Sequence, residues 1–167
     1  PFGLAACPKD VGGDGKTATV DDCSETIQTE WAKTHIVVNE ATDWKDVDAV
    51  LKSAVIRTSM DLRKTLYVYA GKEPGHSVEG RHAEGGAVDI SRIDGVKFSL
   101  MDDASAAALG NAIGAGIANR LPFGQVKMVF TPGMAFRFDR PMSLEQNRAL
   151  IGAHRDHVHV SVIGSTP

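Results

Sequence analysis

Apolar residues recur with the period of a helix in three parts of the chain. A 3-4 spacing predicts a helix that begins after Thr42 or Asp43 and ends near Ser59. Its apolar face would hold Trp44, Val47, Val50, Leu51, Ala54 and Val55. Two further helices are predicted over residues 102–120, where two acidic residues suit a helix N-terminus, and 143–153, which open on a capping-box pattern.

Runs of β-branched and aromatic residues predict strands over residues 65–70, 86–91, 126–130, 135–138 and 157–162. Asp94-Gly95 stands between two apolar residues and is typical of a hairpin turn. The last strand alternates, so that His157 and His159 share one face while its valines point to the core. Together these elements predict an α+β fold, with a small, mostly antiparallel sheet and two to three flanking helices.

Composition indicates one globular domain, because 167 residues of which 43% are hydrophobic can bury a substantial core. The net charge of -3 provides no basic surface for nucleic acid. No apolar run approaches the roughly 20 residues of a membrane span. We expect a loop-rich N-terminal arm over residues 1–24 and a monomeric domain over residues 25–167. The chain opens on Pro1 rather than Met, which indicates a mature form or an excised domain whose export signal has been lost.

The two cysteines, Cys7 and Cys23, flank a loop rich in glycine and aspartate. A disulfide between them would close a loop of about 15 residues and contribute a few kcal/mol in an oxidising compartment. Two unrelated thiols in a cytosolic protein are the alternative. The spacing does not match the CxxC pairs of zinc sites.

Candidate metal ligands occur in two segments far apart in the chain. Residues 81–89, Arg-His-Ala-Glu-Gly-Gly-Ala-Val-Asp, place His82 seven residues before Asp89. A catalytic zinc needs three protein ligands and leaves the fourth position to water. His82, Asp89 and either His157 or His159 would meet that need if the fold brings them together.

Asp89 supports this interpretation because it lies inside an apolar strand, where an unpaired carboxylate is costly. A salt bridge to Arg81 or Arg92 would explain it equally well. His154, at the end of the third predicted helix, is expected to cap that helix or to support the site.

The motifs His-x-x-Gly-x-Ala-x-Asp, over residues 82–89, and Asp-His-x-His, over residues 156–159, resemble those of the zinc D-Ala-D-Ala carboxypeptidases and peptidoglycan endopeptidases (peptidase family M15). This group is related to the lysostaphin-type metallopeptidases, and the resemblance covers residues 65–163. It implies a fold like that of the hedgehog domains and D-Ala-D-Ala peptidases, with one Zn²⁺ per chain bound by His82, Asp89 and His159. It also implies that Asp156 is the general base and that His157 stabilises the oxyanion.

The identity of the base depends on where the last strand begins. Asp156 can serve only if it lies on a loop before the strand; if the strand begins earlier, His157 is the better base, as in the lysostaphin-like relatives. The chain departs from the family in having Gly80 where a serine is usual and no arginine on strand 65–70. This departure favours an endopeptidase over a carboxypeptidase. The candidates for substrate binding are Lys72, His76 and Arg81.

The resulting expectation is a secreted, periplasmic or cell-wall-associated zinc peptidase whose partner is a peptidoglycan peptide. If the chain is an antibacterial effector, an inhibitor or immunity protein would be a second partner. A zinc-bearing binding module without catalysis, and a metal-dependent amidase or protease with another substrate, are the alternatives.

Overall fold

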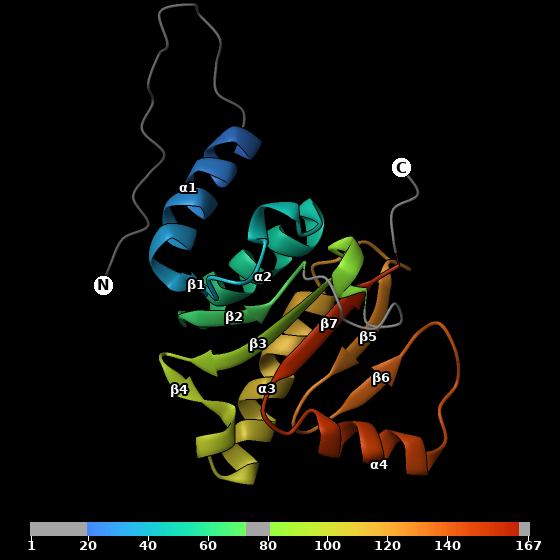
Figure 1. The fold of residues 1–167 in the computed structure, drawn as a ribbon. Helices are drawn as coiled ribbons and strands as arrows, with labels where there is room; N and C mark the ends of the chain where they lie inside the picture. Colours follow the sequence, from blue (N-terminus) through green and yellow to red (C-terminus); the bar gives the residue numbers. More distant parts are fainter. Residues whose placement is uncertain (1–19, 73–80, 164–167) are drawn as a thin grey trace, which may run out of the picture.

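The computed structural model describes residues 20–72 and 81–163, with side chains from residue 25 onward. Within these ranges the fold is α+β, with four α-helices and seven strands (Figure 1). The helices are α1 Val20–His35, α2 Ala49–Leu62, α3 Asp103–Ala118 and α4 Leu144–Ala153. The strands are β1 Ile36–Val38, β2 Leu66–Ala70, β3 Ala87–Ile93, β4 Val96–Lys97, β5 Val126–Phe130, β6 Ala135–Arg137 and β7 Val158–Val162. Three short 3-10 helices are η1 Trp44–Asp46, η3 His82–Glu84 and η4 Phe98–Leu100.

The strands form one open sheet in the order β1-β2-β3-β7-β5-β6, and β4 pairs with β3. Only β1 and β2 run parallel; every other described pair is antiparallel. The expected mostly antiparallel sheet is therefore confirmed. The strands β3 and β7 lie side by side at its centre, although about 70 residues separate them along the chain.

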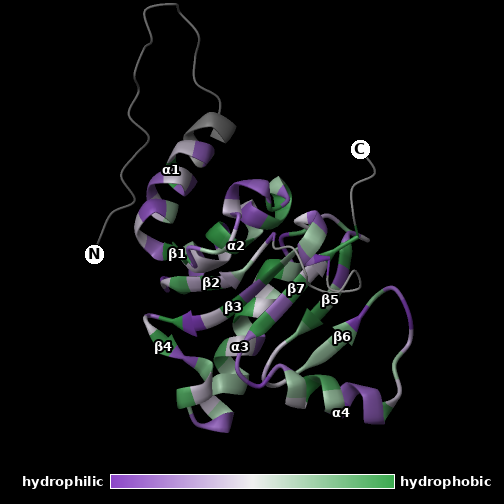
Figure 2. Cartoon of the chain, in the orientation of Figure 1, coloured by the Kyte–Doolittle hydropathy of each residue, from purple (hydrophilic) through white to green (hydrophobic). Residues whose placement is uncertain are grey.

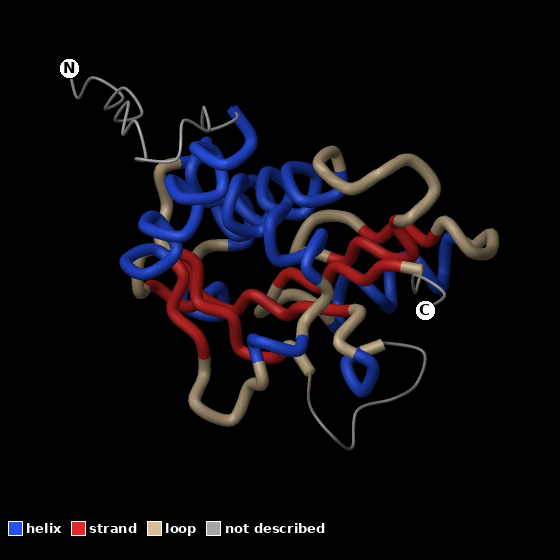
Figure 3. Tube along the Cα trace, turned by 90° about the horizontal axis from the view of Figure 1, so that it is seen from above, coloured by secondary structure: helices blue, strands red, loops and turns tan. Residues whose placement is uncertain are grey.

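Helices α2 and α3 pack against one face of the sheet. The view from above shows most of the helical segments gathered on one side of the strands (Figure 3). Helix α2 packs on α3, and α1 packs on α2 and β1. The core between helices and sheet includes Leu51 and Val55 of α2, Ile113 and Ile117 of α3, and Val88 of β3. Hydrophobic residues accordingly gather on the central strands, whereas α1 is largely hydrophilic (Figure 2). The opposite face of the central strands is left to polar side chains.

The sequence prediction misplaced the start of the first predicted helix. Residues 44–46 form η1, and α2 begins only after Asp48, whose side chain accepts hydrogen bonds from the backbone N–H of Val50 and Leu51. Asp43 makes no such capping bond. The helix then continues to Leu62, where Arg63 ends it in the left-handed conformation.

Helix α1 was not predicted, and it begins at Val20, so residues 20–24 are helical rather than part of a loop-rich arm. The number of flanking helices is thus four in the described ranges, not two to three. The other predicted elements are confirmed, including the capping box at Ser143 and the Asp94-Gly95 turn, where both residues have positive φ. Among the described residues, no helix combines the length and apolar character that a membrane crossing requires.

Several sequence expectations concern residues outside the described part of the chain. The arm over residues 1–19, the side chains of Cys7 and Cys23, and His76 belong to this group. The predicted disulfide and the role of His76 stay predictions.

Candidate metal centre

Two neighbouring strands and one short helix bring the three predicted metal ligands together. Asp89 of β3 and His159 of β7 are directly opposite in the antiparallel register, so their side chains leave the same face of the sheet. Val88 and Val160, their neighbours along the strands, point into the core on the other face. His82 begins η3, which leads into β3.

The ligand atoms of these three residues converge in a buried position. The Nδ1 of His159 lies 2.7 Å from one carboxylate oxygen of Asp89, and the Nε2 of His82 lies 3.3 Å from the other. All three ligand atoms lie within 4.8 Å of one another. His82, Asp89 and His159 are only 3%, 9% and 5% exposed. Asp89 therefore pairs with imidazoles, and the alternative of a salt bridge to Arg81 or Arg92 is not what the structure shows.

The donor set fits a divalent metal ion. The Nδ1 of His82 lies 2.8 Å from the carbonyl oxygen of Gly71, which can only accept a hydrogen bond. In the neutral ring the Nε2 lone pair then points at the Asp89 carboxylate, an arrangement that is repulsive unless a proton or a cation lies between them. Ligands placed tetrahedrally around zinc are about 3.3 Å apart, and the two distances from Asp89 are 2.7 and 3.3 Å. This group could hold a metal ion, with two nitrogens and one oxygen from the protein.

The electrostatics of Asp89 point the same way. Burial by itself would raise the pKa of this carboxyl, but hydrogen bonds with His159 and His82 outweigh that effect and hold its pKa far below the ordinary value. Asp89 is therefore a carboxylate at neutral pH despite its burial. A buried anion between two imidazoles could hold a cation.

Backbone contacts hold η3 and its histidine in place. Gly85 ends η3 with φ +74°, and its carbonyl accepts a hydrogen bond of 2.9 Å from the N–H of Asp48. A Cβ at Gly85 would lie 2.2 Å from the carbonyl oxygen of Asp46. The contact between Gly71 and His82 fixes the ring from the other side, an arrangement typical of the second shell of metal ligands.

Asp156 and His157 precede the ligand strand. Strand β7 begins at Val158, so Asp156 lies on the turn between α4 and β7, as its predicted role as base requires. The Nδ1 of His157 lies 2.7 Å from a carboxylate oxygen of Asp156. The side chain of His157 is 23% exposed and that of Asp156 is 58% exposed, so solvent reaches both.

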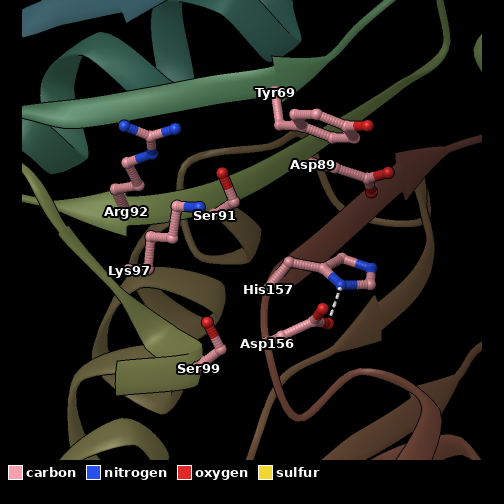
Figure 4. A pocket seen from close by; sticks show the side chains of 8 residues that line it. All are labelled: Tyr69, Asp89, Ser91, Arg92, Lys97, Ser99, Asp156 and His157. Atoms are coloured by element: carbon pink, nitrogen blue, oxygen red, sulfur yellow. Dashed lines mark hydrogen bonds and ion pairs between the residues drawn. The ribbon is translucent and has the colours of Figure 1, made fainter. Parts of the chain in front are cut away.

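One cleft, with a volume of about 350 Å³, is lined by this pair and by Asp89, one of the three candidate ligands. Figure 4 shows Asp89 and His157 together at one end, with Asp156 hydrogen-bonded to His157. The other lining residues are Tyr69, Ser91, Arg92, Lys97 and Ser99. No sequence pattern marks these residues as lining the site, and only Arg92 was expected near it, as a possible partner of Asp89.

Two of the substrate-binding candidates, Arg81 and Lys72, lie elsewhere. Arg81 forms an ion pair of 2.6 Å with Glu84, and Lys72 lies 3.4 Å from a carboxylate oxygen of Asp46. Neither lines the cleft that contains Asp89. Their role in substrate binding stays a prediction.

His154 ends α4, as expected, and places another imidazole beside those of His157 and His159. Its Nδ1 lies 2.8 Å from the carbonyl oxygen of Leu150, and its ring centroid is 4.8 Å from that of His157 and 5.9 Å from that of His159. Burial is the main reason why its pKa is lowered. A neutral ring at this position packs against the site without adding charge to it.

Comparison with known proteins finds no similar family model, curated protein or solved structure.

Proposed function

We propose that this chain is a zinc metallopeptidase that cleaves peptide bonds within bacterial peptidoglycan. The observation that carries the proposal is the buried group of His82, Asp89 and His159, of which Asp89 lines the same cleft as the Asp156–His157 pair. The resemblance of the two motifs to peptidoglycan peptidases supports the choice of substrate. A secreted or cell-wall-associated location follows from that substrate.

Zinc held by this group would act as a Lewis acid on water and on the scissile carbonyl. The protein supplies the ligand set through two imidazole nitrogens and one carboxylate oxygen that already face one another. Three ligands leave one coordination position open, which is the arrangement of catalytic rather than structural zinc sites. Burial of the three ligand side chains also limits the access of bulk water to them.

The Asp156–His157 pair supplies proton transfer. The bond between Asp156 and Nδ1 of His157 orients the ring and leaves Nε2 free to exchange a proton. In one assignment, which the start of β7 at Val158 permits, Asp156 accepts a proton from the attacking water and later delivers it to the leaving amine, while His157 donates a hydrogen bond to the oxyanion. In the other assignment His157 transfers the proton, while Asp156 positions the ring and stabilises its charged form.

A glutamine at position 157 separates these two assignments. Glutamine can donate a hydrogen bond but cannot act as a base at neutral pH. If His157 transfers the proton, His157→Gln lowers kcat by about 10²- to 10⁴-fold. A variant that keeps kcat within about tenfold of the wild type would show that His157 acts as a hydrogen-bond donor and would move the base to Asp156.

The proposed function is tested by digesting purified peptidoglycan with the wild type, His82→Ala and His35→Ala. His35 stacks on Trp31 in α1 and serves as the matched histidine control. Mass spectrometry of the released fragments should show the same new peptides with the wild type and the control, and none with His82→Ala. No products from a zinc-loaded wild type would reject the peptidase and favour a non-catalytic binding module.

A further inference from the structure

The cleft has a second end, which is cationic. Arg92 of β3 and Lys97 of β4 line the cleft together with the hydroxyl groups of Ser91 and Ser99 (Figure 4). The metal end of the same cleft holds two carboxylates, Asp89 and Asp156. The cleft therefore has an acidic end that suits a metal ion and a basic end that suits an anion.

A bulge in β3 turns Arg92 into the cleft. The register pairs Val68 with Ile90 and Tyr67 with Arg92, so Ser91 is an extra residue without a partner on β2. Val88, Ile90 and Ile93 all belong to the core, and the step of three from Ile90 to Ile93 reverses the alternation of faces. Arg92 consequently lies on the face of Asp89 instead of the core face. Bulges beside functional sites commonly redirect a side chain in this way.

The guanidinium of Arg92 is held but not neutralised. Its Cζ lies 4.5 Å from the centre of the Tyr67 ring, which orients the planar group. Its Nε is buried without a hydrogen-bond acceptor, and within residues 20–72 and 81–163 no carboxylate forms an ion pair with it. Such an arrangement is costly unless a ligand compensates for it.

Lys97 increases that cost. It stands directly opposite Arg92 in the β3–β4 hairpin, and like charges in this position destabilise a sheet. The nearest acid of the hairpin, Asp94, is engaged by Lys64 at 2.6 Å and by the N–H of Thr65 at 2.8 Å. In the part of the chain that is described, Lys97 likewise has no carboxylate partner. An anion bound between Arg92 and Lys97 would relieve the repulsion.

We propose that Arg92 and Lys97 form a subsite for a free carboxylate of the bound peptide. Arg92 follows Asp89 by three residues, about 10 Å along a strand. A peptide extended along the cleft would span that distance with about three residues, so the carboxylate belongs to a residue about three positions from the bond cleaved rather than to the residue next to it. This inference rests on the proposed function for the identity of the ligand, and it explains how the chain recognises an acidic peptide without an arginine on β2.

A binding measurement tests the subsite separately from hydrolysis. The full chain carrying Asp156→Asn and His157→Gln, which remove both candidate bases, is titrated calorimetrically with the peptide L-Ala-γ-D-Glu-L-Lys-D-Ala-D-Ala. The matched probe is the same peptide with the glutamyl carboxylate amidated. We expect the free acid to bind about tenfold more tightly than the amide, as a charge-assisted hydrogen bond requires.

Arg92→Gln and Lys97→Gln should each remove this preference, whereas Arg57→Gln should keep it. Arg57 is an exposed cation on α2, in the helical layer on the other face of the sheet. Lys97→Gln should also keep or raise the melting temperature, because it removes a repulsion; a merely structural lysine would lower it. Equal affinity for the two peptides, no binding of either, or an unchanged preference in both variants would overturn the subsite. Hydrolysis of peptidoglycan would still stand on its own experiment.

Discussion

Two glycines show how single residues shape the surroundings of the site. Gly85 and Gly95 both have a left-handed backbone, with φ +74° and +82°. Gly95 completes the turn of the β3–β4 hairpin, and nothing lies within 4 Å of an added Cβ. At Gly85 an added Cβ would meet the backbone of Asp46, because η3 lies close against η1. The hydrogen bond from the N–H of Asp48 to the carbonyl of Gly85 holds η3 there. A substitution at Gly95 therefore tests backbone strain alone, whereas one at Gly85 tests backbone strain together with a steric clash.

We expect Gly95→Ala to lower the free energy of unfolding by about 1 kcal/mol, the cost of the left-handed backbone alone. Gly85→Ala should cost more than about 2 kcal/mol, because η3 must also move away from Asp46. Urea unfolding of both variants measures the difference. Equal losses would mean that η3 is not held by this contact.

At the scale of elements, α2 depends on a cap that its sequence pattern did not reveal. Asp43 and Asp48 both precede apolar residues at helical spacing, and only the structure shows that Asp48 bonds to the first turn, at 2.9 and 3.0 Å. Residues 44–46 form a separate turn that packs Val47 into the core. The choice between the two aspartates was therefore made by packing.

Asp48→Ala should destabilise the protein by about 1 kcal/mol, the usual contribution of an N-cap. Asp43→Ala is the matched control and should change stability by less than about 0.5 kcal/mol, as expected for a surface position. Thermal unfolding of the two variants distinguishes them. A larger loss at Asp43 would restore the cap predicted from the sequence.

The β3–β4 hairpin is tied to the start of β2 by Asp94. Its side chain accepts hydrogen bonds from Lys64 and from the backbone N–H of Thr65, and the bond with Lys64 is the main reason why its pKa is lowered. Because the folded-state pKa lies below the unfolded value, the stabilisation is present above the unfolded pKa. It is lost as the pH falls through the folded pKa.

Asp94→Asn keeps a residue that tolerates the left-handed turn and removes only the charge. We expect a loss of about 0.5 kcal/mol at pH 7, small because the side chains of this pair are 44% and 41% exposed. At pH values below the folded pKa the wild type and the variant should be equally stable. Urea unfolding at pH 7 and at a series of lower pH values tests this, and a difference that does not diminish as the pH falls would show that charge is not its cause.

At the scale of the molecule, the candidate metal centre joins two segments that lie about 70 residues apart in the chain. His82 and Asp89 belong to η3 and β3, whereas His159 belongs to the last strand. A metal ion that binds only the folded arrangement stabilises the whole fold by mass action. Removal of the ion would leave the anion of Asp89 between two imidazoles.

Zinc at about 1,000 times its dissociation constant should add about 4 kcal/mol of stability, or about 10 °C in melting temperature. A chelator should reverse this shift. Asp89→Asn should lose most of it, while His35→Ala should keep it. An equal shift in Asp89→Asn would mean that the ion binds elsewhere on the chain.

The sequence alone determined the local features, because each depends on short-range chemistry. The Asp94-Gly95 turn, the capping box at Ser143 and the alternation of His159 with its valines were all predicted and are confirmed. The candidate ligands could be named for the same reason, since a carboxylate inside an apolar strand requires a partner wherever the strand lies. The sequence predicted that His82, Asp89 and His159 lie close together, and the fold brings them together.

Only the tertiary structure decided the features that depend on neighbours distant in sequence. The apolar stripe of α1 is narrow, with Ile27 and Trp31 four residues apart, and the helix is also held by contacts such as the 2.8 Å hydrogen bond from Trp31 to Ser59 of α2. The bulge at Ser91 exists only relative to β2, so no pattern within β3 could place Arg92 in the cleft. The periodicity of the sequence indicates which side chains are buried in the core. Strand register and packing determine which of the remaining side chains come into contact.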